Sequence, residues 1–251
     1  MTPVLACDRL GGGRPVALLH GFTQTRRCWG GLDELLAERH EVIRVDLPGH
    51  GDAERLARPL GEVSDALADT VGSAVWIGYS MGGRHLLQLA ADRPDVVEGA
   101  VLIGATAGIR DDDERAERHR LAGERASQVI ADGVEAFLDD WLALPMFSTV
   151  PEAAAHVEER RRNSVEGLAS SLVLAGTGNQ APLWQRLDSR APAVFVVGER
   201  DERFRGIAEE LDAAWAGPSR VESIPGCGHA AHLEAPELVA EVIERLVVEL
   251  G

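Results

Sequence analysis

Residues 75–84 of this 251-residue chain read Val-Trp-Ile-Gly-Tyr-Ser-Met-Gly-Gly-Arg. The first three residues are expected to end a buried β-strand, and a helical pattern begins directly after Ser80. Ser80 would then stand at the tip of a sharp strand-to-helix turn, which Gly78 and Gly82 allow to close. The dipole of the following helix favours developing negative charge at this point. The stretch therefore predicts a catalytic serine at position 80; the alternative is an ordinary tight turn.

Outward from this turn, short apolar runs alternate with helical patterns along the chain. Most runs are continuous, which is typical of strands buried on both faces of a parallel sheet. The alternation predicts an α/β fold with a mostly parallel, doubly wound sheet, whose site lies at the carboxyl ends of the strands. The expected strands are Val16–Leu19, Val42–Val45, Val75–Ile77, Val101–Ile103, Val194–Val197 and Val221–Ile224, and the clearest helices are Trp29–Arg39, Ser64–Val71, Met81–Ala91, Ile207–Trp215 and Pro236–Leu250.

The alternation breaks between about residues 108 and 182. This stretch has helical patterns and no convincing strand. We therefore expect a helical cap over 108–182, inserted into a core formed by 1–107 and 183–251.

Composition narrows the class of protein. With 45% hydrophobic residues the chain can bury a large core, and its net charge of −16 disfavours nucleic acids and anionic membranes as partners. All 25 basic residues are arginine, so lysine chemistry such as a Schiff base is excluded. Three cysteines without a Cys-x-x-Cys pair fit neither a disulfide framework nor a zinc ribbon. Together with the absence of a signal-peptide pattern or a membrane-length apolar run, this predicts a cytoplasmic protein.

A catalytic serine needs a base, and the base needs an acid that orients it. Asp201 follows the expected strand at Val194–Val197, and His229 follows the one at Val221–Ile224, so both would lie at strand carboxyl ends. We expect Asp201 as the acid and His229 as the base. Glu199 is the alternative acid and His232 the alternative base.

An oxyanion hole should combine the amide after the serine with one from an early loop. The amide of Met81 is the first candidate. The second is the amide of Phe22, which follows the first expected strand in the run His20-Gly21-Phe22. We interpret His20 and His50 as structural residues.

These motifs, together with Asp46-Leu47-Pro48-Gly49-His50-Gly51, resemble the α/β-hydrolase superfamily over the whole chain. A narrower resemblance is to the 2-succinyl-6-hydroxy-2,4-cyclohexadiene-1-carboxylate synthases of menaquinone biosynthesis. It rests on five stretches of the sequence. They are the motif at 78–84, Glu114–Arg118, Trp141 with Pro145 and Phe147, Gly198–Asp201 with Phe204 and Arg205, and Gly228–His232. That family implies a carbon–oxygen lyase on the α/β-hydrolase fold, which eliminates pyruvate without a cofactor or metal.

The resemblance also implies a pocket for a small polycarboxylate. Arg84 follows Ser80 by four residues on one helix face, and its planar guanidinium could bind a carboxylate through two hydrogen bonds. The residues that match family pocket positions are Arg84, Arg118, Trp141, Arg162 and Tyr79.

The residues leave some alternatives open. The same triad would serve a serine esterase or thioesterase, and a ligand-binding protein without activity could retain the fold. Whether Ser80 or His229 is the immediate base, and whether the chain forms oligomers, stays open.

Overall fold

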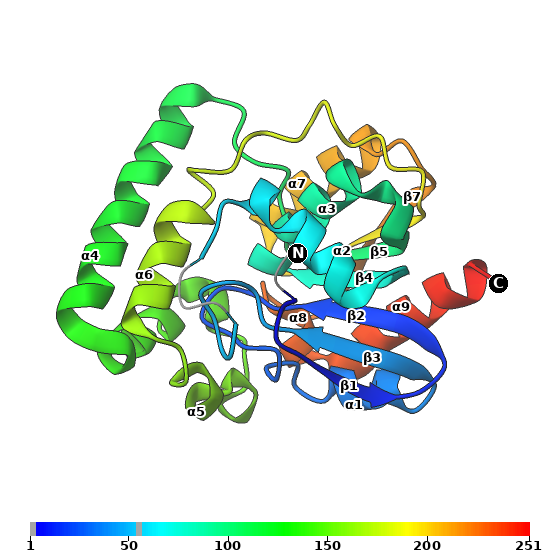
Figure 1. The fold of residues 1–251 in the computed structure, drawn as a ribbon, viewed down its shortest axis with the longest axis horizontal. Helices are drawn as coiled ribbons and strands as arrows, with labels where there is room; N and C mark the ends of the chain where they lie inside the picture. Colours follow the sequence, from blue (N-terminus) through cyan, green and yellow to red (C-terminus); the bar gives the residue numbers. More distant parts are fainter. Residues whose placement is uncertain (1–3, 54–56) are drawn as a thin grey trace.

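The computed structural model describes residues 4–53 and 57–251 as a seven-stranded sheet with helices on both faces (Figure 1). The strand order is β1-β3-β2-β4-β5-β6-β7, and β1 alone among these strands runs antiparallel to its neighbour. The predicted mostly parallel, doubly wound sheet is therefore confirmed. The strands are β1 (Cys7–Gly11), β2 (Arg14–Leu19), β3 (His40–Val45), β4 (Ala74–Tyr79), β5 (Val97–Ile103), β6 (Ala193–Gly198) and β7 (Ser219–Ile224).

Both faces of the central strands are buried, which explains their continuous apolar runs. In β2, Ala17 and Leu19 pack toward α2, α3 and α7, whereas Val16 and Leu18 pack toward α1 and α9. Successive side chains of a strand point to opposite faces, so every position of the run must be apolar. The helices that cover these faces are α1 (Leu32–Ala37), α2 (Ser64–Val71), α3 (Met81–Asp92), α7 (Glu202–Ala214) and α9 (Pro236–Glu249), and a short α8 (Ala231–Glu234) precedes the last.

The structure differs from the sequence expectations at an edge strand and at several element bounds; α7, for example, begins at Glu202 rather than Ile207. The edge strand β1, which pairs with β3, was not expected, because its half-exposed sequence Cys-Asp-Arg-Leu-Gly has no apolar run. Helix α1 begins at Leu32 rather than Trp29, since Gly30 and Gly31 both adopt positive φ angles that a helix does not allow.

Between β5 and β6, which are neighbours in the sheet, the chain forms only helices and turns. Helix α4 (Asp112–Leu142) packs along α6 (Val165–Leu174) beside one end of the sheet, with the short α5 (Val157–Arg160) between them in the chain (Figure 1). Gly133 interrupts α4 with a non-helical backbone. A small core of Val129, Phe137 and Leu168 holds α4 and α6 together. A separate cap with limits at 108 and 182 stays a prediction.

None of the helices in residues 4–53 and 57–251 is both long and apolar enough to cross a membrane.

Candidate active site

The turn from β4 to α3 has the strained geometry that its sequence predicts. Ser80 has a φ of 49° and a ψ of −103°, and its amide donates a hydrogen bond of 2.8 Å to the Ile103 carbonyl of β5. A Cβ on Gly82 would lie 1.9 Å from the Leu19 carbonyl oxygen, and one on Gly78 would lie 2.6 Å from that of Gly82. The two glycines therefore let the turn pack against the end of β2 and present the serine.

Ser80, His229 and Asp201 come together at the carboxyl ends of β4, β7 and β6. Nε2 of His229 lies 3.3 Å from the Ser80 hydroxyl oxygen, and Nδ1 lies 2.8 Å from Oδ2 of Asp201. The other carboxylate oxygen of Asp201 accepts a bond of 3.3 Å from the Phe204 amide and caps α7. This arrangement can move a proton to or from the serine while the carboxylate orients the imidazole.

Glu199 and His232, the alternative acid and base, form contacts outside this arrangement. Glu199 accepts a 2.8 Å hydrogen bond from the Gly226 amide and so closes the turn after β7. His232 is fully buried between the rings of Tyr79 and Trp29, at centroid distances of 4.1 and 5.3 Å. Burial holds the pKa of His232 well below its usual range, which leaves the ring neutral.

The two candidate oxyanion donors border the same cavity. Met81 is the first residue of α3, and the first amides of a helix have no acceptor within that helix. Phe22 lies in the loop after β2, which is held by a 2.8 Å hydrogen bond from the Gly21 amide to the Gln24 side chain. Both residues line the cavity that also contains Ser80.

His20 has the contacts expected of a structural residue. Its Nε2 accepts a bond of 3.1 Å from the Leu47 amide, and its Nδ1 lies 2.8 Å from the Gly21 carbonyl oxygen. His50 is likewise buried, with Nδ1 3.4 Å from the Pro48 carbonyl oxygen.

A cavity of about 690 Å³ lies above the serine, between the sheet and the helices that follow β5. Asp201 lies behind His229, and Arg162 lies outside the cavity. The predicted site residues that line it are Phe22, Tyr79, Ser80, Met81, Arg84, Arg118, Trp141 and His229.

Trp141 packs against Phe22 and Phe147, with ring centroids 5.0 and 5.9 Å apart. Its indole nitrogen is buried without a hydrogen-bond partner in the structure. Trp141 therefore offers an unused donor at the wall of the cavity.

Arg84 is only 8% exposed, although it carries a charge. Its guanidinium donates to the Ala175 carbonyl, and no carboxylate of residues 4–53 or 57–251 forms an ion pair with it. Burial lowers the pKa of Arg84 to about 10, so it remains a cation at neutral pH. A buried cation without a counter-ion is costly, which indicates a site for an anion.

The second cation of this kind is Arg160, not the predicted Arg162. Arg160 is 2% exposed and lines the cavity; it donates to the Thr23 hydroxyl and, over 2.7 Å, to the Ala155 carbonyl. Burial lowers its pKa, and it has no carboxylate partner within the described ranges. Arg162 instead lies at the surface, where it pairs with Asp52 and Glu159 at 2.9 Å.

The sequence alone did not distinguish these arginines, because three of them, at 160–162, are consecutive. Arg160 is the last residue of α5 and faces the cavity, whereas Arg162 lies in the turn that follows and pairs with Asp52 at the surface. Because all three residues are arginine, the sequence does not indicate which of them faces the cavity.

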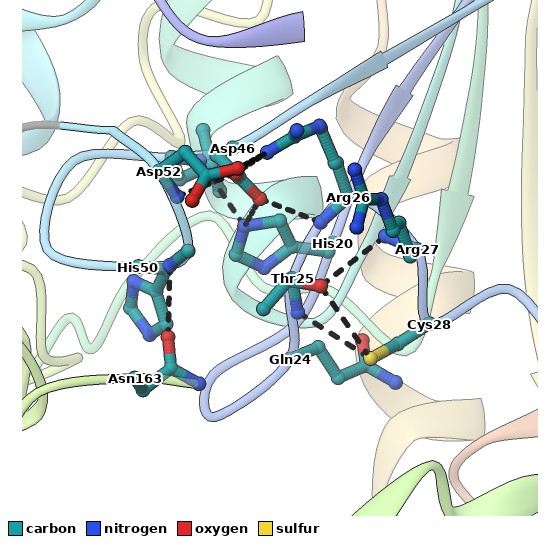
Figure 2. A network of polar contacts seen from close by, with 12 residues as sticks. His20, Gln24, Thr25, Arg26, Arg27, Cys28, Asp46, His50, Asp52 and Asn163 are labelled. Carbon is teal, nitrogen blue, oxygen red and sulfur yellow. Dashed lines mark hydrogen bonds and ion pairs between the residues drawn. The ribbon is translucent and has the colours of Figure 1, made fainter. Parts of the chain in front are cut away.

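A polar network holds the two loops on the β2–β3 side of the site (Figure 2). Asp46 is fully buried after β3, and its carboxylate accepts bonds from the Arg26 amide at 2.7 Å and the Asp52 amide at 2.8 Å. The Arg26 guanidinium pairs with the carboxylates of both Asp46 and Asp52. The loop that carries Phe22 is thus fixed to the loop after β3.

Comparison with known proteins agrees with this geometry. Residues 16–242 match the model of the alpha/beta hydrolase family. The 2-succinyl-6-hydroxy-2,4-cyclohexadiene-1-carboxylate synthase of Enterobacter sp. (strain 638) is 31% identical over 92% of this chain and 91% of its own. A relative from Bacillus subtilis (strain 168), whose name is the same with the word putative before it, is 33% identical over 94% of this chain and 90% of its own.

The solved structure of MenH from S. aureus covers 97% of this chain and 98% of its own, with 26% identity and a TM-score of 0.90. The chain therefore belongs to the α/β-hydrolase family and, within it, to the family of the 2-succinyl-6-hydroxy-2,4-cyclohexadiene-1-carboxylate synthases.

Proposed function

We propose that this protein eliminates pyruvate from 2-succinyl-5-enolpyruvyl-6-hydroxy-3-cyclohexene-1-carboxylate in menaquinone biosynthesis, and that it does so in the cytoplasm. The observation that carries the proposal is the pair of buried guanidiniums, Arg84 and Arg160, in the cavity that contains Ser80 and His229. Neither has a carboxylate partner among the residues described. A substrate with several carboxylates would supply the missing charges.

The triad supplies the proton transfer. His229 and Ser80 together remove a proton from the cyclohexene ring, and Asp201 stabilises the imidazolium that forms. The electrons of the broken C–H bond form a new ring double bond, the existing ring double bond shifts by one position, and the bond to the enolpyruvyl oxygen breaks. The leaving enolpyruvate takes up a proton and becomes pyruvate, so atoms and charge balance.

The amides of Phe22 and Met81 stabilise the negative charge that develops on oxygen during this step. Fixed amide donors of this kind contribute most where charge forms only in the transition state. Arg84, Arg160 and Arg118 bind the carboxylates, and Trp141 and Tyr79 form the wall against which the ring packs.

Ester or thioester hydrolysis is the second candidate, because a serine nucleophile would also use His229 with the Asp201 carboxylate at its Nδ1 and the Ser80 hydroxyl at its Nε2. The two buried arginines favour the elimination, since a small neutral ester gives them nothing to bind.

The direct test is incubation with the enolpyruvyl substrate while pyruvate release is followed by a coupled dehydrogenase assay. We expect catalytic release of pyruvate together with the ultraviolet absorbance of the conjugated diene. Absence of pyruvate, combined with hydrolysis of simple esters, would overturn the proposal in favour of the esterase.

A further inference from the structure

The segment 159–163 spans the end of α5 and the turn toward α6, and it contacts the loops that follow β2 and β3. The hydroxyl of Thr25 donates to Glu159 over 2.8 Å, Arg160 donates to the hydroxyl of Thr23, and Arg162 pairs with Asp52. These contacts join residues that are 110 to 137 positions apart in the chain. Within the described chain, the segment is therefore a junction between the inserted helices and the loop that carries Phe22.

Asn163 belongs to this junction, and Figure 2 shows its side chain beside the loop that contains His50. It is 5% exposed, and its Oδ1 accepts a hydrogen bond of 2.9 Å from the Gly51 amide. Its Nδ2 donates to the Thr23 carbonyl at 2.7 Å and to the Arg160 carbonyl at 2.9 Å. One acceptor and two donors are thus satisfied, and only a side-chain amide of this length provides both kinds of group.

The three residues that Asn163 binds are Thr23, Gly51 and Arg160. Two of them have an unusual backbone conformation, and the third lines the cavity. Thr23 has a φ of 65°, a left-handed conformation that is unfavourable for a threonine, and it directly follows Phe22. Arg160 lines the cavity, and its guanidinium donates to Thr23 and Ala155 at the same junction. Gly51 has a φ of 54° and packs directly against the carboxylate of Asp46. Strain of this kind persists only where surrounding contacts determine the backbone.

We propose that Asn163 is a positioning residue that fixes the Phe22 amide and the Arg160 guanidinium relative to each other across this junction. The inference rests on the proposed elimination for its kinetic consequences, but its structural part does not depend on that reaction. Asn163 itself lies outside the set of cavity-lining residues, so it acts through the Thr23 and Arg160 backbones.

The test uses N163A and N163D in the full chain, with N179A as the matched control. Asn179 is the only other asparagine of the sequence; it is exposed, and its Nδ2 donates to the Leu174 carbonyl over 2.8 Å. N163D keeps the shape and the acceptor for Gly51 but loses both donors, so it isolates the contacts to Thr23 and Arg160.

We expect kcat for pyruvate release to fall roughly 10- to 100-fold in both Asn163 variants, because small displacements of reacting groups have effects of this size. KM should also rise, since Arg160 loses its anchor, and N179A should match the wild type. All rates are taken well below the measured Tm of each variant. If kcat and KM of N163A stay within about twofold of the wild type, where positioning predicts a far larger change, the residue has only a structural role and the proposal is overturned.

Hydrogen–deuterium exchange gives a second measurement that needs no substrate. Peptides covering residues 20–28 should exchange faster in N163A than in the wild type or N179A, because the Thr23 carbonyl loses its donor. If the wild-type protein releases no pyruvate, the proposed function fails, and the exchange data alone decide about Asn163. Unchanged exchange over residues 20–28 would then overturn its positioning role.

Discussion

Arg84 lies one helical turn after Ser80, and the two side chains line the same cavity. The guanidinium donates to the Ala175 carbonyl next to α6, and no carboxylate in the part of the chain that the structure describes neutralises it. The serine and the cation thus line the cavity from the same helix end. If Arg84 binds a substrate carboxylate, we expect that carboxylate to lie close to the reacting carbon.

Arg84→Ala should therefore cripple pyruvate elimination. Removing one partner of a buried charge pair costs about 2–5 kcal/mol, or tens- to thousands-fold in kcat/KM. Hydrolysis of a small neutral ester, where the wild type shows it, should be nearly unchanged. The control is Arg186→Ala, which removes an exposed arginine that pairs with Asp92. Equal losses in both reactions would show that Arg84 only supports the turn.

Arg160→Ala and Arg162→Ala should behave differently, although the residues are neighbours in the sequence. Arg160 is buried at the cavity, so its loss should raise KM for the polycarboxylate about tenfold or more. Arg162 forms exposed ion pairs, which contribute about 0–1 kcal/mol, and its loss should change kcat/KM by less than about fivefold. Steady-state kinetics on both variants decide the matter, and the opposite order would restore Arg162 as the substrate arginine.

Ser80→Ala and His229→Ala should each abolish most activity, and the double variant should be hardly worse than either, because the residues act as a unit. Asp201→Asn should keep the fold but reduce turnover, since the histidine would lose its oriented tautomer. Glu199→Gln is the matched control in the same loop, because Glu199 binds the Gly226 amide instead of His229. A normal rate for Asp201→Asn with a slow Glu199→Gln would transfer the role of the acid to Glu199.

Three buried histidines should make the protein sensitive to acid. Burial lowers the pKa of His20 to about 4 and the pKa of His50 and His85 to about 3. In the unfolded chain each titrates near 6.5, so below that pH the unfolded state binds more protons. The free energy of unfolding is therefore highest above about pH 6.5 and falls toward pH 4, by up to about 1.4 kcal/mol per pH unit for each histidine.

Urea unfolding midpoints at pH 7.5 and pH 5 measure this effect. His85→Gln should reduce the pH dependence, whereas substitution of the exposed His119 to Gln should leave it unchanged. Identical midpoints of the wild type at the two pH values would contradict the prediction.

The sheet could be predicted from the sequence because parallel strands with two buried faces have continuous apolar runs. The triad could be predicted because Ser80, Asp201 and His229 each follow such a run, and the topology then brings strand ends together. The edge strand β1 was missed because an edge needs no such run. Arg160 was missed because burial of one arginine among three depends on how the junction packs, and that information lies in residues such as Thr23 and Ala155.

The position of the triad in the chain has a consequence for how the protein folds. Ser80 and His229 are 149 residues apart, and their contact requires β4, β5, β6 and β7 to be paired in order. Contacts between residues far apart in the sequence form late in folding. The chain must first lose the entropy of closing a long loop, and only then does the contact stabilise it. Catalytic activity should therefore return as the last signal during refolding, after helical circular dichroism and tryptophan fluorescence have recovered.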